Sequence, residues 1–165
     1  MVGGDMSFLR HRRKHFRDTV NYLYNLGSEV VAWQAGTTNS TGSQSKQADH
    51  LYLYASSASS TAWRTYETTN KVSLTASSII KIDWSNTGAA TASNYARVYV
   101  HTTRPAGLID YTAKLDIANT FSRQTSQFVL TGLASGDYYI TIWASDSAKG
   151  SAATSEVKVF KVWLE

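Results

Sequence analysis

The sequence predicts an all-β protein, an antiparallel β-sandwich of the jelly-roll type. Charged residues make up only 17% of the chain, which is rich in the Thr, Val, Tyr and Trp that suit pleated surfaces. Roughly nine or ten short segments alternate apolar and polar residues, and turns containing Gly, Ser or Asn separate them. No segment between them has a clear helical pattern, which disfavours an alternating β–α–β organisation.

The expected strands follow one another from residue 28 to the C-terminus. Residues 34–47 and 87–93 are polar and are expected to be loops. Within each segment successive side chains fall on opposite faces, so Ile140 and Ile142 share one side while Thr141 and Trp143 share the other. The expected strands are SEVVAW (28–33), DHLYLYAS (49–56), TAWRTYETTN (61–70), KVSLT (71–75), SIIKIDWSN (78–86), NYARVYVHTT (94–103), YTAKLDI (111–117), SQFVLTG (126–132), GDYYITIWAS (136–145) and EVKVFKVWLE (156–165).

The 165 residues suit one domain with a short extension: a basic N-terminal arm at 1–20 and a β-sandwich domain at 21–165. Most of the net charge of +4 lies at the start, because residues 1–18 carry five Lys or Arg against two Asp, a local charge of +3. The lack of Cys excludes disulfides and cysteine nucleophiles. No stretch approaches the roughly 20 apolar residues of a membrane helix, and residues 1–16 lack the apolar core of a secretory signal.

The arm allows two interpretations. Leu9, Phe16 and Leu23 recur every seven residues, which favours a helix over 7–24 that stops near Gly27. Alternatively, RHRRKHFR is an extended arm and NYLYNLGSEVVAW already belongs to the sheet. Such a basic segment suits an acidic protein surface, an acidic lipid surface or nucleic acid, or stays solvated. Nucleic acid is the least favoured, because no aromatic-lined groove or known nucleic-acid-binding motif follows.

Several strands carry large side chains on the face that should be wet. We interpret this aromatic face in three ways: as a sugar-binding platform, as a subunit interface, or as a second, minor core covered by loops or the arm. Trp63 and Tyr66, beside the Ser-rich turn, are expected to be loop aromatics and a second contact pair, whereas Trp33, Trp84 and Trp163 are expected in the core. The aromatic face comprises Tyr52, Tyr54, Arg97, Tyr99, His101, Tyr139 and Trp143.

No catalytic or metal-binding motif stands out, so we expect a protein that is not an enzyme and carries no cofactor. His11 and His15 have helical ligand spacing, but the surrounding Arg and Lys oppose a cation there. The carboxylates are scattered singly, which gives no glycosidase pair, and no serine sits in a nucleophile elbow. The stretches SGD (135–137) and DSAKG (146–150) offer oxygen atoms for a structural calcium but lack part of its expected ligand set.

Five ordered stretches resemble the C-terminal β-sandwich module of minor structural and tail-associated proteins from bacteriophages and prophages of Bacillus-type hosts. They span residues 21–165 and consist of strand and turn sequence without a catalytic signature. The resemblance implies a jelly roll like that of carbohydrate-binding modules, placed at the periphery of a virion where it contacts host surface glycans. The stretches are NYLYNLGSE, SKQADHLYLYASSAS, NKVSLTASSIIKIDWSNTG, FSRQTSQFVLTGLASGDYYITIWAS and VKVFKVWLE.

That module usually ends a longer tail polypeptide, whereas here only the arm precedes it. We therefore expect a non-enzymatic virion protein, a capsid decoration or tail accessory protein assembled in the host cytoplasm. Its expected partners are other virion proteins, copies of itself and host cell-wall glycan; nucleic acid and membrane are not expected. A free carbohydrate-binding module and a glycan-cleaving enzyme are the alternatives. The residues expected to anchor the arm are Leu9, Arg10, Arg12, Arg13, Lys14, Phe16 and Arg17.

Overall fold

The computed structural model describes residues 21–25, 31–39, 41–57, 62–88, 94–104, 111–118, 120–146 and 153–165. Within these ranges no helix is long and apolar enough to cross a membrane, and every regular element is a strand. The strands are β1 (Asn21–Tyr24), β2 (Trp33–Thr38), β3 (Thr41–Lys46), β4 (Leu51–Ser57), β5 (Ala62–Thr68), β6 (Val72–Leu74), β7 (Ile79–Gly88), β8 (Asn94–His101), β9 (Ala113–Ala118), β10 (Thr120–Val129), β11 (Gly136–Asp146) and β12 (Ala153–Leu164).

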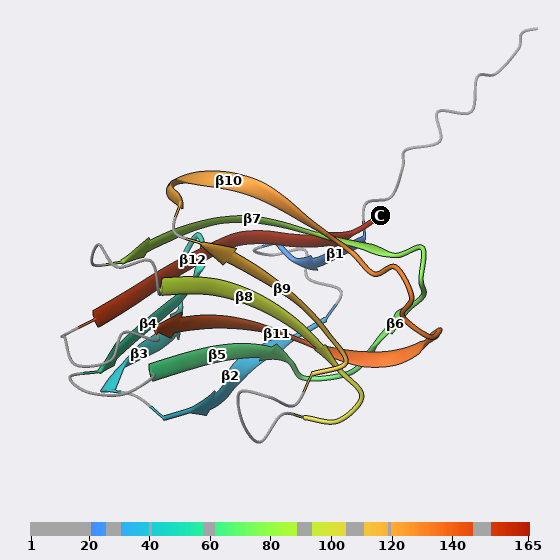
Figure 1. Ribbon diagram of the computed structural model, residues 1–165, viewed down its shortest axis with the longest axis horizontal. Helices are drawn as coiled ribbons and strands as arrows, with labels where there is room; N and C mark the ends of the chain where they lie inside the picture. The colour runs from blue at the N-terminus through green and yellow to red at the C-terminus, as the bar shows by residue number, and fades with distance from the viewer. Residues whose placement is uncertain are drawn as a thin grey trace, which may run out of the picture.

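The strands form two antiparallel sheets that pack as a sandwich (Figure 1). Sheet A has the order β10-β7-β12-β4-β3, and β1 pairs with the end of β12. Sheet B has the order β2-β5-β11-β8-β9, and β6 pairs with the start of β11. Consecutive strands often cross from one sheet to the other, as β4–β5, β7–β8 and β11–β12 do. This arrangement confirms the predicted antiparallel β-sandwich of jelly-roll type.

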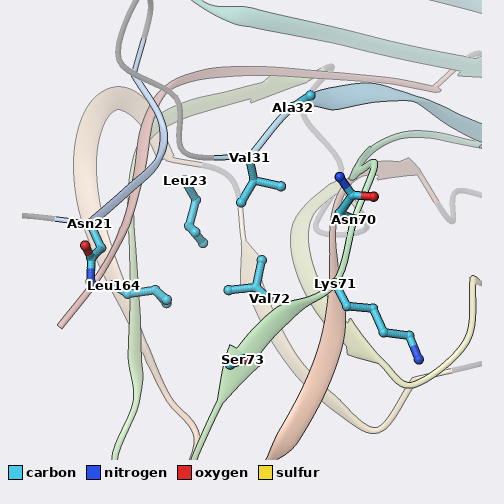
Figure 2. Close-up of a pocket in the computed structure, with 9 residues that line it drawn as sticks. All are labelled: Asn21, Leu23, Val31, Ala32, Asn70, Lys71, Val72, Ser73 and Leu164. Atoms are coloured by element: carbon cyan, nitrogen blue, oxygen red, sulfur yellow. The ribbon is translucent and has the colours of Figure 1, made fainter.

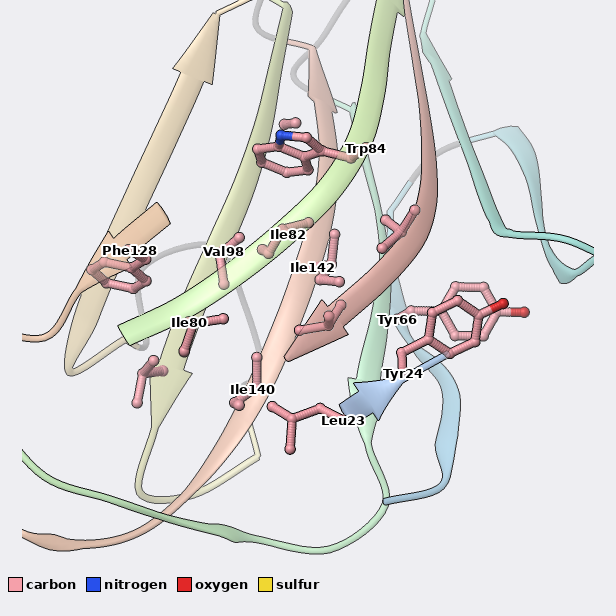
Figure 3. Packing of buried hydrophobic residues seen from close by; sticks show 14 of the residues in the cluster. Leu23, Tyr24, Tyr66, Ile80, Ile82, Trp84, Val98, Phe128, Ile140 and Ile142 are labelled. Carbon is pink, nitrogen blue, oxygen red and sulfur yellow. The ribbon is translucent and has the colours of Figure 1, made fainter. Parts of the chain in front are cut away.

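The core lies between the sheets and follows the predicted alternation. Ile80 and Ile82 on β7 and Ile140 and Ile142 on β11 are fully buried in it (Figure 3). Trp84 is 1% exposed, as predicted, and its indole Nε1 donates a hydrogen bond to Ser126 Oγ at 3.0 Å. Burying one of these isoleucine side chains contributes about 1.5–3 kcal/mol to the free energy of unfolding. The alternation therefore fixes which face of each strand points outward.

Residues 34–47 are not the predicted loop. They contain β2 and β3, and β3 pairs with β4 from Thr41 opposite Ser56 to Lys46 opposite Leu51. Gly42 has φ of 143°, and a Cβ there would collide with the carbonyl oxygen of Tyr54. Because β3 is an edge strand, backbone pairing with β4 holds it and its side chains can be polar. The polar composition of this segment, which resembles that of a loop, is that of a solvent-exposed edge of the sheet.

Two other expectations change at the ends of the strands. Residues 21–24 form β1, as the second interpretation of the arm expected, and not the end of a helix, since Asn21 and Tyr22 pair with Leu164 and Trp163 of β12. The side chain of Trp163 is only partly buried, because it points away from the core beside Lys81. The arm at 1–20, with all its predicted anchoring residues, lies outside the described residues.

Candidate functional site

The predicted aromatic face is in fact two faces on opposite sides of the molecule. Tyr52 and Tyr54 lie on β4 and point outward from sheet A, because the alternating residues Leu51 and Leu53 point into the core. The other predicted residues lie on β8 and β11, which are neighbours in sheet B. Sequence alternation assigned the correct side of each strand, but it could not tell which sheet a strand joins.

Sheet B carries a cluster of contacting rings on its outer face. Tyr99 lies 5.1 Å from Trp143 and 4.8 Å from Tyr111 between ring centroids. Trp143 lies 6.1 Å from Trp63, and His101 lies 5.7 Å from Tyr99. Aromatic pairs at these separations stabilise one another beyond their burial alone. We call these five side chains the ring cluster.

The centre of the ring cluster is buried rather than bare. Trp143, Tyr99 and His101 are 0%, 1% and 2% exposed, so the expectation of an open platform is wrong for these three. The alternative that this face forms a second, minor core describes them better. The rim is accessible, because Trp63 is partly exposed and Tyr111 is 39% exposed.

Two further predicted site residues, Arg97 and Tyr139, are also partly exposed on this face. Arg97 Nη1 donates to the hydroxyl of Tyr99 at 3.3 Å. The guanidinium of Arg104 lies 4.9 Å from the ring centroid of Tyr139, and Lys71 Nζ lies 5.7 Å from it. The accessible rim therefore combines aromatic rings with cations that sit over or beside them.

Trp63 and Tyr66 are not loop residues, since both belong to β5. They also point in opposite directions. Trp63 joins the ring cluster on the outer face, whereas Tyr66 is 6% exposed and belongs to the core. Burial raises the pKa of the Tyr66 hydroxyl above its usual 10.0. Tyr66 is therefore unsuited to contact a ligand, and its predicted site role has no geometric support.

Three polar atoms lie in a row along β11 without a hydrogen-bond partner among the described residues. They are Thr141 Oγ1, Trp143 Nε1 and Ser145 Oγ, and all three residues are fully buried on the outward side of the strand. Buried polar groups are nearly always bonded, and leaving one unbonded costs about 1–3 kcal/mol. A row of them on one face is thus an unusual feature that requires an explanation.

A buried carboxylate lies in the same sheet, next to the ring cluster. Glu67 is 5% exposed, and its Oε1 accepts hydrogen bonds from Arg104 Nη1 at 2.6 Å and Gln34 Nε2 at 2.9 Å. Gly36 on the neighbouring strand β2 leaves room for this network, since a Cβ there would collide with Thr65 Oγ1 and lie 3.3 Å from Glu67 Oε2. This network could not be recognised from the sequence, because Glu67 and Arg104 are distant in the chain.

The chemistry of this network is that of an ion pair rather than of an acid–base couple. Among the residues whose burial the structure describes, Glu67 is the only buried carboxylate, and its charged partner is Arg104. A glycosidase needs two carboxyl groups facing a substrate. Within the same ranges no three His, Asp or Glu side chains gather closely enough to hold a metal ion.

The outer face of sheet A differs in its burial. Tyr52, Tyr54 and Phe160 are partly exposed there, and His50 lies 5.6 Å from Phe160. The guanidinium of Arg123 lies 3.8 Å from the Phe160 centroid. Burial, followed by the negative charge of Glu156 and its hydrogen bond at 3.3 Å, raises the pKa of Tyr52 above 10.0.

A pocket of ≈ 480 Å³ opens between the ends of the two sheets (Figure 2). Apolar side chains from β1, β6 and β12 converge in it, and polar ones lie around them. None of the predicted site residues lines it, and none of its polar groups is both buried and unpartnered. Its lining residues are Asn21, Leu23, Val31, Ala32, Asn70, Lys71, Val72, Ser73 and Leu164.

Comparison with known proteins places the fold. Neither a protein-family model nor a curated protein matches the sequence. The carbohydrate recognition domain of Emp47p matches with a TM-score of 0.52 over 88% of this chain and 93% of that domain, at 11% identity. A CBM4 structure matches with a TM-score of 0.51 over 81% and 93%, at 15% identity. The legume lectin-like domain from Entamoeba histolytica matches at 0.50 over 81% and 89%, at 7% identity. The chain thus has the β-sandwich fold seen in carbohydrate-binding modules and lectins.

Proposed function

We propose that this protein is a carbohydrate-binding β-sandwich whose glycan site is the outer face of sheet B. The observation that carries the proposal is the row of unpartnered polar atoms of Thr141, Trp143 and Ser145 beside the ring cluster. Rings cover the apolar side of a pyranose, and polar atoms bond its hydroxyls. The structural neighbours named as a carbohydrate recognition domain and a lectin-like domain support the same ligand class.

The ring cluster gives the site a rigid floor and an accessible rim. The ligand first contacts Trp63 and Tyr111, whose exposed edges flank the buried Tyr99 and Trp143. Because the floor is locked by ring contacts, little side-chain entropy is lost on binding. Trp143 is 0% exposed, so its unbonded indole N–H would meet a ligand hydroxyl only after the rim side chains of Trp63 and Tyr111 move aside.

The test is a glycan array probed with the full chain, covering neutral and acidic glycans and purified cell-wall fragments. We expect Trp63→Ala and Tyr111→Ala each to weaken binding at least about tenfold, the size of a typical aromatic hot spot. Tyr54→Ala on sheet A is the matched control and should bind as the unmodified chain does. Absence of glycan binding, or its loss only in Tyr54→Ala, would remove this proposal.

We further propose that the protein acts on a bacteriophage particle as a non-enzymatic component held by residues 1–20. The sequence resemblance over residues 21–165 supports this role, and the basic composition of the arm fits an acidic protein surface. Many copies on one particle would strengthen weak glycan contacts through avidity.

Mass spectrometry of purified particles tests the virion role directly. We expect the protein in the particle, and we expect a chain without residues 1–18 to fold but not to assemble. Full assembly of the shortened chain would place the anchor elsewhere, and absence from the particle would leave a free carbohydrate-binding module as the function. Release of sugar from purified cell walls by the protein would instead show an enzyme.

A further inference from the structure

A stripe of partly exposed rings crosses the outer face of sheet A. Tyr52 and Tyr54 on β4 stand beside β12, where Trp163 also points outward and lies opposite Tyr22 of β1. The outer face of an antiparallel sheet is normally polar when it meets only water. We call the following residues the ring stripe: Tyr22, His50, Tyr52, Tyr54, Phe160 and Trp163.

A β-bulge places Phe160 in the middle of this stripe. Val159 lies opposite Trp84 and Lys161 lies opposite Asp83, so Phe160 is the extra residue of β12. As a result Phe160 and Lys161 both point outward, while Val159 and Val162 on either side remain fully buried. Bulges re-aim side chains at sites where a surface has a task. The bulge increases the aromatic content of this face at no cost to the core.

The carboxylates of this face are paired with cations of the same face. Arg123 binds Asp83 through two hydrogen bonds of 2.8 and 2.6 Å. On either side of this pair, Lys81 lies 2.6 Å from Glu165 and Lys158 lies 3.0 Å from Glu156. A strongly basic partner would therefore gain little from the face, because Asp83, Glu156 and Glu165 each already have a cation beside them.

We propose that the ring stripe is the interface through which this chain binds a second copy of itself. Interface cores are enriched in Tyr, Trp, Phe and Arg, which are the residues of this stripe. A two-fold symmetric interface places one patch against its own copy, so the patch must complement itself. An aromatic stripe flanked by ion pairs does so, because neutral rings meet neutral rings and the carboxylates of Asp83, Glu156 and Glu165 each already have a cation beside them.

This proposal does not depend on glycan binding, since the ring stripe and the ring cluster lie on opposite sheets. The pairing would leave the outer face of sheet B of both copies free. Two glycan sites facing away from a shared interface would then be placed to link two separate glycan-bearing surfaces.

Sedimentation velocity of the full chain over a range of concentrations tests the interface. We expect a reversible dimer whose dissociation constant rises at least about tenfold in Phe160→Asp, as for a central interface residue. Tyr54→Arg is a second variant, at the other end of the ring stripe, and should also raise the dissociation constant of the dimer. Tyr111→Asp, an equal insertion of charge on sheet B, should leave the dimer unchanged. Circular dichroism confirms that each variant is folded.

Three outcomes would overturn the proposal. The first is a protein that stays monomeric at every concentration up to about 100 μM, because its self-association would then be too weak for a stable interface. The second is a dimer that Tyr111→Asp dissociates and Phe160→Asp does not. The third is a monomer whose glycan binding is lost in Phe160→Asp and kept in Tyr111→Asp, which would make the stripe the glycan site.

Discussion

The two outer faces of the sandwich use aromatic residues in opposite ways. On sheet B the rings of Tyr99 and Trp143 are buried, and polar atoms beside them lack partners among the described residues. On sheet A the rings of Tyr52 and Phe160 are partly exposed, and the charges beside them are paired. Sheet B thus has buried polar atoms without partners beneath its rings, whereas sheet A has ion pairs beside rings that are partly exposed.

Aromatic content alone therefore does not define a binding site. A face with unbonded polar atoms suits a ligand rich in hydroxyl groups, because the ligand supplies the missing hydrogen bonds. A face with paired charges and open rings suits another protein surface, because its gain comes from removing apolar area from water. The predictions below test whether the faces differ in this way.

The largest expected effect is the loss of a buried ring from sheet B. Trp143→Ala should lower the free energy of unfolding by about 3–5 kcal/mol, because it leaves a cavity under Trp63 and Tyr99. Tyr54→Ala on sheet A should cost about 1 kcal/mol, since that side chain is partly exposed. Urea unfolding of both variants measures the difference, and equal losses would mean that sheet B has no minor core.

The next effect concerns the ion pairs of the two faces. The side chain of Glu67 is 6% exposed, and Arg104→Met leaves its carboxylate with Gln34 as the remaining side-chain hydrogen-bond donor. The free energy of unfolding should therefore fall by about 2 kcal/mol. Arg123→Met removes the ion-pair partner of Asp83. Because the side chain of Arg123 is 52% exposed, this loss should lower the free energy of unfolding by less than about 1 kcal/mol. The same unfolding assay compares them. If Arg123→Met is the more damaging variant, our ranking of the two networks fails.

A smaller effect, of opposite sign, should appear within sheet B. Thr141→Val replaces an unpartnered buried hydroxyl by a methyl group of the same shape, and should stabilise the fold by about 1 kcal/mol. Thr65→Val is the matched control, because Thr65 Oγ1 donates to the carbonyl oxygen of Thr37 at 2.9 Å and its loss should destabilise. Thermal unfolding reports the sign. Destabilisation by Thr141→Val would show that its hydroxyl is bonded in solution.

The smallest effect is a pH dependence on sheet A. The pKa of Tyr52 is raised above 10.0 by burial and by Glu156. Below pH 10 this hydroxyl is protonated in both folded and unfolded chains, so its contribution to stability is fully present. As the pH rises through the folded pKa the contribution is lost, because the unfolded chain releases its proton first. Tyr52→Phe should therefore lose less stability above pH 10 than the unmodified chain, and an identical pH profile would contradict this assignment.

The fold could be predicted from the sequence because alternation is a local property. The segment around Ile140 and Ile142 specifies both its strand and its buried side, and the structure confirms both. Residues 41–46 could not be recognised in this way, because an edge strand is held by backbone pairing and needs no apolar side chains.

The candidate site was predictable only in part. Tyr99 and Trp143 were correctly assigned to an outward side, but their burial depends on contacts with Tyr111, which precedes β9, and with Trp63 of β5. The pairing of Glu67 with Arg104 likewise depends on the order of the strands in sheet B. No local pattern reports strand order, so residues from both sheets were grouped into a single face.

Nuclear magnetic resonance of the indole N–H groups tests the central claim most directly. The tryptophan signals of the unmodified chain, assigned with single Trp→Phe variants, are followed as the tightest glycan from the array is added. We predict that the signals of Trp63 and Trp143 shift, Trp143 in the direction of a newly bonded N–H, while that of Trp163 on sheet A stays in place. A shift of Trp163 with no change at Trp63 and Trp143 would contradict a glycan site on sheet B.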